Sequence, residues 1–441
     1  MKMYDSYKDS GVEWIDQIPS DWAVLKNKYF TKAAKEPSQT GEEDLLSVSE
    51  YSGVVPRKTI RIGEDHITRS DSLVGYLVVK KGQLVSNIML MWKRGLGVSD
   101  FNGIVSPAYS VFDFTQGNPR YFHYLYRTDM YISEFRRNST GVIESRLRLY
   151  DDSFGAIHSH FPPIETQNEI VHFLNAKTSL IDSLIEKTQR KIELLREKRT
   201  SIINEAVTKG LNSNIEMKDS GIKWIGKIPS HWLCNPMKYI TEGNKDSIRT
   251  GPFGSSLKSD EFKEEGIRVY NQRSVYDEDF SKSQLFVSQE KYEELKGFEV
   301  IPQDVLVTSR GTIGRMTVVP DNGEIGVLHP CLIRLRLNRE IISDRFLWYY
   351  MNQSSLFLTS VSFESNSTTI EVIYSKTLSN IKFPLPPLSE QQKIVEYLEN
   401  NIQKLDKNLS IEKERANLLK EYRQSLISSV VTGKIKVTED A

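Results

Sequence analysis

An internal repeat constrains this chain more than any other feature. Residues 8–22, KDSGVEWIDQIPSDW, match residues 218–232, KDSGIKWIGKIPSHW, at ten of fifteen positions. A second pair follows, FPPIETQNEIVHFL at 161–174 and LPPLSEQQKIVEYL at 385–398. We call the first pair the tryptophan motifs and the second the Pro-Pro motifs. Because self-similarity at a fixed spacing marks one structural plan used more than once, the sequence predicts two copies of one plan.

The segments between these motifs have diverged. Only short echoes remain, such as GQLVS (82–86) with DVLVT (304–308) and SPAY (106–109) with HPCL (329–332). Similar ends with different middles predict two domains of one type that perform different versions of one task. A chain of 441 residues is also too long for a single core. We expect a first globular domain at 1–160, a first long helix at 161–210, a second globular domain at 211–384, and a second long helix with a C-terminal tail at 385–441.

Each Pro-Pro motif opens a long helix. Proline pairs end the preceding strand and fix the start of the next element. No proline or glycine occurs from Glu165 to Ala206, and apolar residues there alternate at spacings of three and four, which is typical of a coiled coil. Thr188, Glu412, Arg199 and Arg423 interrupt the apolar stripe and are expected to set its register. The predicted interface residues are Leu174, Ile181, Ile185, Ile192, Leu195 and Ile202, with Leu398, Leu405, Leu409, Leu419 and Leu426.

The connection between the copies predicts how the helices run. The link after the first helix is short, KGLNSNIE at 209–216. A parallel pair would require the second domain to return the chain along roughly 60 Å of helix at 1.5 Å per residue. The predicted fold is therefore α+β, with two globular domains at opposite ends of an antiparallel two-helix coiled coil and pseudo-twofold symmetry.

Within the domains we expect short strands and embedded helices. DVLVTSRGTIGRMTVV (304–319) alternates around a glycine turn and predicts a β-hairpin, with YLVVKKGQLVSNIMLMW (76–92) as its counterpart. Residues 118–137 and 343–358 predict amphipathic helices. Their aromatic side chains are expected in the core rather than as platforms for stacking bases.

Searches for catalytic chemistry favour a protein that is not an enzyme. A Walker loop, zinc-spaced Cys/His sets, H-E-x-x-H and G-x-S-x-G are absent from the sequence. His158 and His160 alternate like strand residues and lack neighbouring ligands, so no metal site is expected. Two cysteines, Cys234 and Cys331, fit a reducing compartment. Without a signal segment or a run of about 18 apolar residues, we expect a cytoplasmic protein that does not enter a membrane.

Local basic clusters are the candidates for binding. Formal net charge is zero, so any basic surface must be local. The loop 249–260, RTGPFGSSLKSD, could let backbone N–H groups and hydroxyls approach an anion, and NQRS (271–274) offers amide and guanidinium groups for base edges. The predicted DNA-binding residues are Lys93, Arg94, Arg136, Arg137, Arg146 and Arg148 in the first domain, and Arg249, Ser255, Ser256, Lys258, Asn271, Arg273, Arg310 and Arg315 in the second.

Four segments together resemble the specificity subunit of a type I restriction–modification system: KDSGIKWIGKIPSHW, GPFGSSLK, LVTSRGTIG and FPLPPLSEQQKIVEYL. The resemblance implies two target recognition domains joined by spacer helices. It implies a non-catalytic, sequence-specific DNA-binding subunit that reads a bipartite asymmetric site in double-stranded DNA and recruits methyltransferase (modification) and restriction/translocase subunits. S-adenosylmethionine, ATP and Mg would be bound by those partners, and this chain would bind no cofactor.

The sequence departs from that pattern in two places. The first domain has no GPFGSS loop, so its DNA contacts are harder to place, and Asp16 stands where the second copy has Gly226. Two alternatives stay open. One is an enzyme with an undetected methyltransferase or nuclease core, and the other is a coiled-coil scaffold that does not bind DNA.

Overall fold

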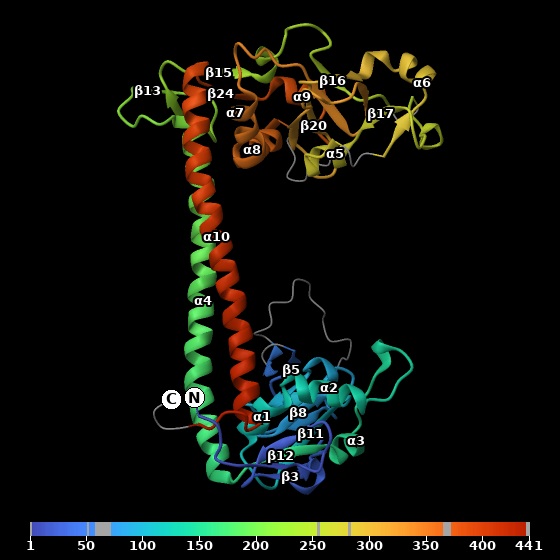
Figure 1. The fold of residues 1–441 in the computed structure, drawn as a ribbon, viewed down its shortest axis with the longest axis vertical. Coiled ribbons are helices and arrows are strands. Elements are labelled where there is room, and N and C mark those ends of the chain that lie inside the picture. Colours follow the sequence, from blue (N-terminus) through green and yellow to red (C-terminus); the bar gives the residue numbers. More distant parts are fainter. Residues whose placement is uncertain are drawn as a thin grey trace. The chain divides into compact units, whose positions relative to one another are not determined.

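The chain forms two compact units, each with its own globular domain and its own part of a helix pair (Figure 1). The computed structural model describes residues 2–50, 53–57, 72–253, 256–280, 284–364 and 372–437. Unit 1 comprises Met1–Gln189 with Glu414–Ala441, and unit 2 comprises Arg190–Lys413. The long helix α4 (Ile164–Lys209) and the long helix α10 (Leu388–Val431) each contribute residues to both units.

Unit 1 is built on a four-stranded antiparallel sheet of order β4-β11-β8-β9. The pairs β1-β2, β3-β12, β5-β6 and β7-β10 surround it. The elements are β1 (Tyr7–Asp9), β2 (Gln17–Pro19), β3 (Ala23–Lys26), β4 (Thr31–Ala33), β5 (Leu46–Ser49), β6 (Gly53–Pro56), β7 (Leu77–Val79), β8 (Leu84–Asn87), β9 (Leu96–Val98), β10 (Gly103–Val105), β11 (Tyr109–Phe114), α1 (Pro119–Tyr126), α2 (Asp129–Arg137), α3 (Asp151–Ala156) and β12 (His158–Phe161).

Unit 2 repeats this plan with a sheet of order β16-β23-β20-β21 and adds a second sheet of order β18-β17-β22-β19. Its elements are β13 (Met217–Asp219), β14 (Lys227–Pro229), β15 (Leu233–Pro236), β16 (Ile248–Thr250), β17 (Ile267–Tyr270), α5 (Gln272–Asp277), β18 (Phe286–Val287), α6 (Gln289–Glu294), β19 (Glu299–Val300), β20 (Val305–Thr308), β21 (Met316–Val318), β22 (Gly326–Leu328), β23 (Leu332–Leu335), α7 (Asp344–Trp348), a π-helical turn (Tyr349–Gln353), α8 (Leu356–Glu364), α9 (Ser375–Asn380) and β24 (Lys382–Leu385).

The strand pairing confirms one predicted hairpin and corrects the other. β20 and β21 pair antiparallel around the glycine turn, as the sequence predicts. The segment 76–92 is not a hairpin, because β7 pairs with β10 whereas β8 pairs with β11 and β9. The true counterpart is the β8–β9 hairpin, whose turn is IMLMWKRG (88–95). The alternation of apolar residues predicted the strands, but it did not predict which strands pair with each other.

The strand pairing also corrects the alignment of the two copies by one residue. The sequence similarity aligned residues 82–86 with 304–308, but the register of the strands aligns Leu84 with Val305. Leu84 lies opposite Phe112, and Val305 lies opposite Leu335 in the equivalent pair of strands. Leu84 therefore corresponds to Val305, and the residues before them, Gln83 and Asp304, correspond to each other. One position earlier, Gly82 and Gln303 share a left-handed backbone, with φ of 93° and 73°.

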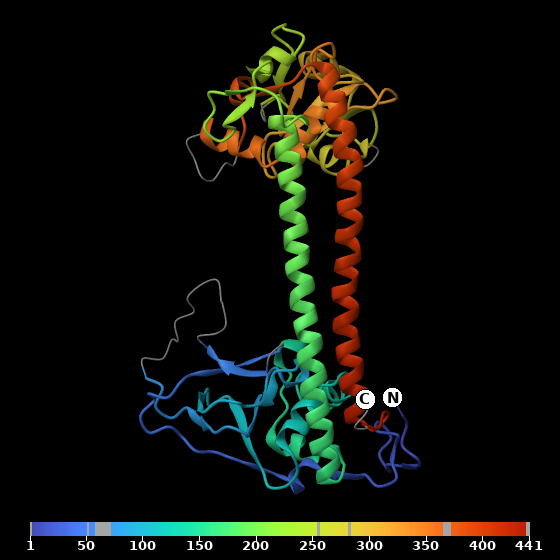
Figure 2. The same ribbon diagram turned by 90° about the vertical axis from the view of Figure 1, so that its left-hand side faces the viewer.

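The two long helices begin where the Pro-Pro motifs predict, immediately after Pro163 and Pro387. Figures 1 and 2 show them side by side within each unit. None of the helices in the described ranges is long and apolar enough to cross a membrane. The predicted interface residues all lie in one of the two main cores or are buried along the seam. Fully or largely buried are Leu174, Ile181, Ile192, Leu398, Leu405, Leu409 and Leu426, and partly buried are Ile185, Leu195, Ile202 and Leu419.

Ion pairs show that the helices run antiparallel. In unit 2, Lys191 pairs with Glu412 at 2.6 Å and Arg199 pairs with Asp406 at 2.8 Å, so a higher number on α4 meets a lower number on α10. In unit 1, Arg423 pairs with Asp182 at 2.8 Å. The polar seam residues Arg199 and Arg423 thus each meet an aspartate on the opposite helix. Such pairs fix the register of a helix pair more than they stabilise it.

Each tryptophan motif packs against the end of a long helix. Trp22 and Trp232 are buried in the cores of their units. A Cβ atom at Gly433, after α10, would lie 3.2 Å from the Trp22 ring, and one at Gly210, after α4, would lie 3.0 Å from the Trp232 ring. Both glycines have positive φ, the usual helix ending. Each domain therefore holds the end of one helix and the start of the other.

The aromatic side chains of the helices in the globular domains lie in the hydrophobic core, as expected. Tyr121, Phe122, Tyr126, Tyr131 and Phe135 of α1 and α2 are fully buried. Trp14 meets the Tyr131 ring edge-on, with centroids 5.1 Å apart. Trp224 stacks on Phe363 at 4.3 Å and its indole N–H donates to Ser360. These tryptophans are packing anchors within their own units. Asp16 adopts φ 63° where Gly226 has φ 71°, so the aspartate keeps the same left-handed turn.

A buried glutamine joins each domain to its long helix. In unit 2, Gln391 accepts a hydrogen bond from the Ser343 N–H at 2.8 Å and donates to the carbonyls of Pro386 and Ile341. In unit 1, Gln167 accepts from the Asn118 N–H at 2.7 Å and donates to the Pro162 carbonyl. Both side chains are completely buried. The glutamine thus satisfies groups at the start of a domain helix and at the start of a long helix together.

We predict that Gln391→Ala loosens this joint. Removing the side chain leaves a buried N–H and two carbonyls unpaired, at about 1–3 kcal/mol for each group. Urea unfolding of the full chain should show unit 2 destabilised by at least about 2 kcal/mol, and hydrogen exchange at the Ser343 amide should accelerate. Gln289→Ala, at an exposed glutamine of α6, is the matched control. Unchanged exchange at Ser343 would contradict the joint.

Candidate nucleic-acid interface

The second domain brings two of its predicted binding segments together. Helix α5 begins at Asn271, and its Gln272 side chain donates to the Arg310 carbonyl. The Tyr276 hydroxyl lies 3.2 Å from both the carbonyl and the N–H of Thr312. The segment NQRS therefore sits directly on the turn SRGTIG that joins β20 and β21. Arg273 and Arg310 project from neighbouring segments of one exposed patch.

The exposed cations of the second domain differ in their polar contacts. The Arg310 side chain is exposed and has no hydrogen bond or ion pair among the described residues, whereas the exposed Lys258 lies near Glu261 and lowers the pKa of that carboxyl. Arg273 is 71% exposed and its Nε lies 3.7 Å from Asp277, a long and solvated pair that holds it weakly. Ser256 is exposed as well. Ser255 lies outside the described residues.

Three predicted contacts of the second domain have structural partners. Arg249 pairs with Asp246 at 2.9 Å and its guanidinium lies 4.9 Å from the centre of the Phe298 ring. The Asn271 side-chain oxygen accepts from the N–H groups of Arg273 and Ser274, so it caps α5 and leaves only its amide donors for another group. Arg315 donates to the Asn352 carbonyl at 2.9 Å.

In the first domain, Arg94 plays the same part as Arg315. Its Nε donates to the Arg127 carbonyl at 3.2 Å, just after α1. Arg127 returns hydrogen bonds to the carbonyls of Arg94 and Leu96, while Asn352 exchanges two hydrogen bonds with Met316. An arginine from the hairpin turn thus clamps the hairpin to the end of α1 in unit 1 and to the π-helical turn after α7 in unit 2. Both arginines stay predicted DNA contacts, and the spacing of residues along the chain did not indicate this shared contact.

The other cations of the first domain surround the loop after α2. Arg136 pairs with Glu144 at 2.5 Å and lies over the Trp92 ring, and Lys93 lies over the same ring at 4.7 Å. Arg137, Arg146 and Arg148 are exposed, with no side-chain hydrogen bond or ion pair among the described residues. The structure therefore brings together Lys93, Arg136 and this loop, which are far apart in sequence.

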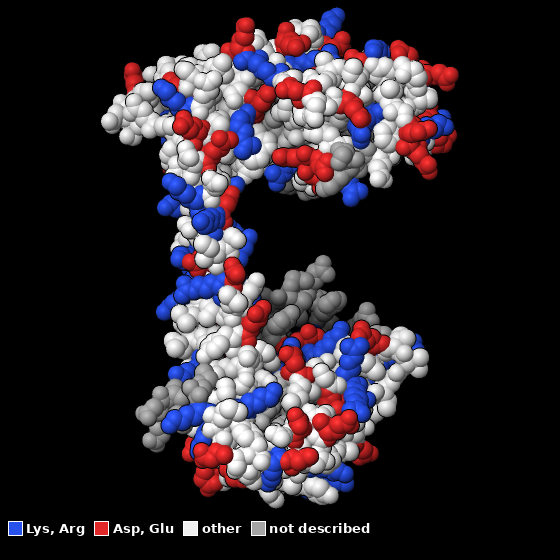
Figure 3. Space-filling view, viewed as in Figure 1, with Lys and Arg blue, Asp and Glu red and all other residues white. Residues whose placement is uncertain are grey.

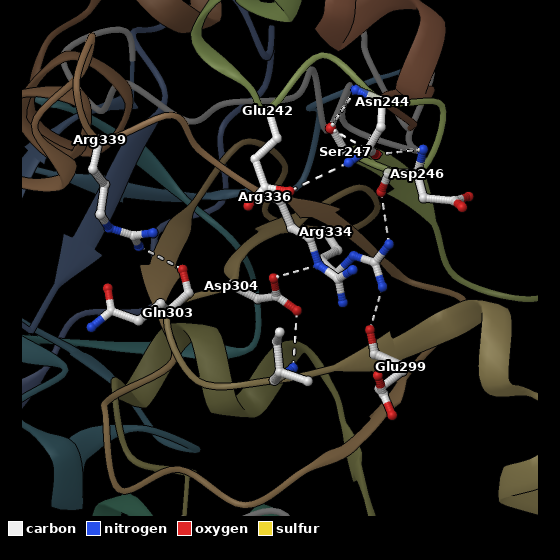
Figure 4. Close-up of polar contacts among 11 residues, drawn as sticks. Glu242, Asn244, Asp246, Ser247, Glu299, Gln303, Asp304, Arg334, Arg336 and Arg339 are labelled. Carbon is white, nitrogen blue, oxygen red and sulfur yellow. Dashed lines mark hydrogen bonds and ion pairs between the residues drawn. The ribbon is translucent and has the colours of Figure 1, made fainter.

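A buried polar network lies beneath the surface of the second domain (Figure 4). Arg334 of β23 is only 2% exposed and donates to the carbonyls of Asp246 and Glu299. The buried Asp304 carboxylate accepts from the Ile301 N–H at 2.9 Å and from Arg336 at 3.0 Å. Burial raises the pKa of Asp304 and lowers the pKa of Arg334. The network ties β23 to the turns on either side, which makes it a structural brace.

The first domain carries the same brace with other residue types. Gln83, the counterpart of Asp304, accepts from the Lys80 N–H at 2.7 Å and donates to Asp113 at 2.8 Å. Asp113 corresponds to Arg336 by strand register. The carboxylate is Asp304 in unit 2, but it is Asp113, on the opposite strand, in unit 1. The side-chain hydrogen bond between the two positions is therefore present in both units, although the charges differ. No sequence pattern indicated the brace, because the echo between the copies was one residue out of register.

Comparison with known proteins agrees with this geometry. Residues 253–421 match the family profile described as "Type I restriction modification DNA specificity domain". The MjaVIII type I restriction enzyme specificity subunit of Methanocaldococcus jannaschii is 24% identical over 438 residues, covering 96% of this chain and 94% of that one. A solved chain from work on complex assembly and conformational transition of the type I R-M system covers 95% of this chain and 99% of that one, with 17% identity and a TM-score of 0.69. The HsdS subunit from Thermoanaerobacter tengcongensis covers 97% of this chain and all of that one, with 16% identity and a TM-score of 0.56.

The second domain and its helix thus match a type I restriction–modification DNA specificity domain, and the chain is similar along nearly its whole length to a type I specificity subunit. The resemblance carried by its tryptophan and Pro-Pro motifs is thereby confirmed. The fold class is confirmed too, as an α+β chain of two globular domains with a coiled-coil helix pair.

Positive and negative charges are mixed on the surface of the chain. Figure 3 shows lysine, arginine, aspartate and glutamate interspersed over the drawn face of each unit. A cavity of about 1000 Å³ in unit 1 is lined by Arg94, Arg120, Arg127, Lys420 and Arg423, among others. Three of its arginines pair with Asp129, Asp100 and Asp182. Most arginines that line the cavity are therefore paired with aspartates. Exposed loops hold cations that have no ion pair among the described residues.

His160 lies in a packed and buried position. No group of three or more His, Cys, Asp or Glu in the described part of the chain could hold a metal ion. The Tyr131 hydroxyl lies 2.8 Å from the Nδ1 atom of His160 and accepts from the His160 N–H. That hydroxyl therefore lies within hydrogen-bond distance of both the backbone N–H and the ring of His160. The Nε2 atom of His160 has no partner among the described residues.

We predict that His160 makes unit 1 sensitive to acid. Burial, with the nearby Lys434, lowers the pKa of His160 to about 3. The unfolded chain, with an imidazole pKa near 6.5, binds one more proton below that pH, so stability is lost as pH falls from about 6.5 towards 3. Between pH 6 and pH 5 the wild type should lose about 1 kcal/mol more than His160→Asn in urea unfolding. Equal losses in both proteins would contradict a neutral, buried His160.

Proposed function

We propose that this chain is a sequence-specific DNA-recognition subunit, in which each globular domain reads one half of a bipartite, asymmetric site in double-stranded DNA. One observation carries the proposal. Two domains share a framework down to the Arg94 and Arg315 clamps, yet each presents different exposed, uncommitted cations on its loops. A repeated framework with divergent loops is what reading two different half-sites requires. As a specificity subunit the chain is not itself catalytic.

The partners follow from the same proposal. Methyltransferase subunits would modify the bases, and restriction/translocase subunits would act on the DNA beyond the site. Those partners would bind S-adenosylmethionine, ATP and Mg, and this chain would bind none of them. A DNA ligand also implies a cytoplasmic location. The long helices, with their paired arginines and aspartates, would act as the spacer between the half-sites.

Selection from random duplexes tests the function. Full-length protein should bind duplex DNA and enrich sequences that contain two short specified blocks separated by unspecified base pairs. Methylation-sensitive sequencing of DNA from cells that carry the complete system should find the same bipartite sequence. A coiled-coil scaffold without a nucleic-acid ligand predicts no binding even at low salt. A chain with a hidden methyltransferase core predicts methyl transfer by the purified chain alone.

We predict that Lys258→Ala and Arg310→Ala weaken binding to all duplexes alike. Both side chains are exposed, and neither forms an ion pair within 4 Å among the described residues, so each can turn to a phosphate. Removing one phosphate contact should reduce the slope of log K against log salt by about 0.9. Titrations of wild type and variants at several salt concentrations measure this. A change of sequence preference without a change of slope would contradict the phosphate assignment.

We predict a different outcome for Arg273→Ala. Its guanidinium is exposed beside the hairpin turn and is held only weakly by Asp277. A guanidinium that meets a base edge with two hydrogen bonds is worth roughly 1–3 kcal/mol of discrimination. The variant should lose preference at one or two positions of one block and leave the other block unchanged. An equal loss for every duplex in a panel of single-base substitutions would show that Arg273 reads no base.

A further inference from the structure

The loop 139–148 of the first domain exposes apolar side chains at its tip. Val142 is 99% exposed and Ile143 is 53% exposed. Ile143 lies beside Met89 and Leu90 of the hairpin turn, which are also exposed. A hollow of about 520 Å³ beside them is lined by Met89, Leu90, Trp92, Lys93, Ile143 and Glu144. Exposed apolar residues grouped in this way mark a surface that meets a partner.

This loop is fixed in place. Thr140 and Arg148 exchange two backbone hydrogen bonds, of 2.9 and 3.0 Å, across its base. The Leu149 N–H donates to the Ile88 carbonyl at 3.0 Å, which ties the loop to the hairpin turn. Gly141 has φ 153°, and a Cβ atom there would lie 2.6 Å from the Arg146 carbonyl oxygen. These contacts hold the backbone of the tip in an exposed position, so less backbone needs to be ordered when a partner binds.

The charges around the tip identify the partner. Residues 134–148 contain four arginines and two glutamates, and Lys93 adds a further positive charge beside the hollow. Arg136 is neutralised by Glu144, while Arg137, Arg146 and Arg148 are exposed and have no ion pair among the described residues. Arginines on both sides of an apolar tip complement a DNA groove, where two rows of phosphates flank the bases.

We propose that the loop 139–148 enters a groove of double-stranded DNA, with Val142 and Ile143 in apolar contact with bases and with Arg146 and Arg148 on the flanking phosphates. This inference rests on the proposed function and supplies the base-contacting residues of the first domain, which lacks a GPFGSS loop. Apolar side chains contact bases in two ways: against the thymine methyl group in the major groove, and as wedges between base steps in the minor groove.

Substitutions at the tip separate base contact from phosphate contact. Val142→Thr keeps the shape and replaces one methyl group by a hydroxyl, so affinity for the selected site should fall by about fourfold. The double change Val142→Ser, Ile143→Ser should cost about tenfold or more. Both losses should map to one block of the bipartite site and leave the salt slope unchanged. Arg146→Ala and Arg148→Ala should instead lower the slope by about 0.9 each without changing sequence preference.

Val74→Thr is the matched control, because Val74 is an exposed valine of the same unit outside the loop. It should bind as the wild type does. Uracil in place of thymine within the affected block distinguishes the two apolar contacts. A methyl contact predicts that uracil weakens the wild type and does not weaken Val142→Ser, Ile143→Ser further, whereas a wedge predicts no effect of uracil. Either result, with the loss confined to one block, supports the inference.

Other outcomes overturn it. If the wild type selects a bipartite site but Val142→Ser, Ile143→Ser binds that site and its single-base substitutions unchanged, the loop does not contact bases. Equal losses in both blocks, or a reduced salt slope for the tip variants, also reject apolar base contact. If the wild type binds no duplex, the proposed function fails and this inference fails with it.

Discussion

The structure depends on one constraint: each globular domain grips the end of one long helix and the beginning of the other. Trp22 packs against the chain just after α10, while the Pro-Pro motif of the same unit starts α4. Trp232 packs just after α4, and its unit starts α10. An end and a beginning can meet in one core only if the helices run antiparallel. The ion pairs of Arg199 and Arg423 with aspartates then follow from that register.

A second consequence concerns where variation is permitted. The buried glutamines, the tryptophans and the arginine clamps are present in both units, because each satisfies polar groups or fills space that the framework creates. The brace beneath the sheet keeps its connection while its charges change, from Gln83 with Asp113 to Asp304 with Arg336. Residues in the loops outside this framework do not have to satisfy its polar groups or fill its core. These loops could therefore acquire different cations and, in the first domain, an apolar tip.

The same distinction limits which arginines can serve a ligand. Composition does not distinguish one arginine from another. The structure separates arginines that bind other groups of their own domain from exposed arginines that have no hydrogen bond or ion pair among the described residues. Arg94 and Arg315 donate to backbone carbonyls, and Arg249 pairs with Asp246. Withdrawing such a group to meet DNA would leave its partners unpaired, whereas Arg146 or Arg310 can turn to a phosphate at the cost of side-chain entropy alone.

By itself the sequence determined the twofold plan, the two long helices, their antiparallel direction and the resemblance to type I specificity subunits. These features rest on local periodicity, on proline positions and on a repeat, all of which can be read along the chain. Tertiary structure alone decided strand partners, such as β8 with β9, and the commitment of each arginine. It also decided that Lys93 and Trp92 adjoin a loop some fifty residues later, with Val142 and Ile143 at its tip. Those outcomes depend on which distant groups share a surface, and no spacing along the chain encodes that.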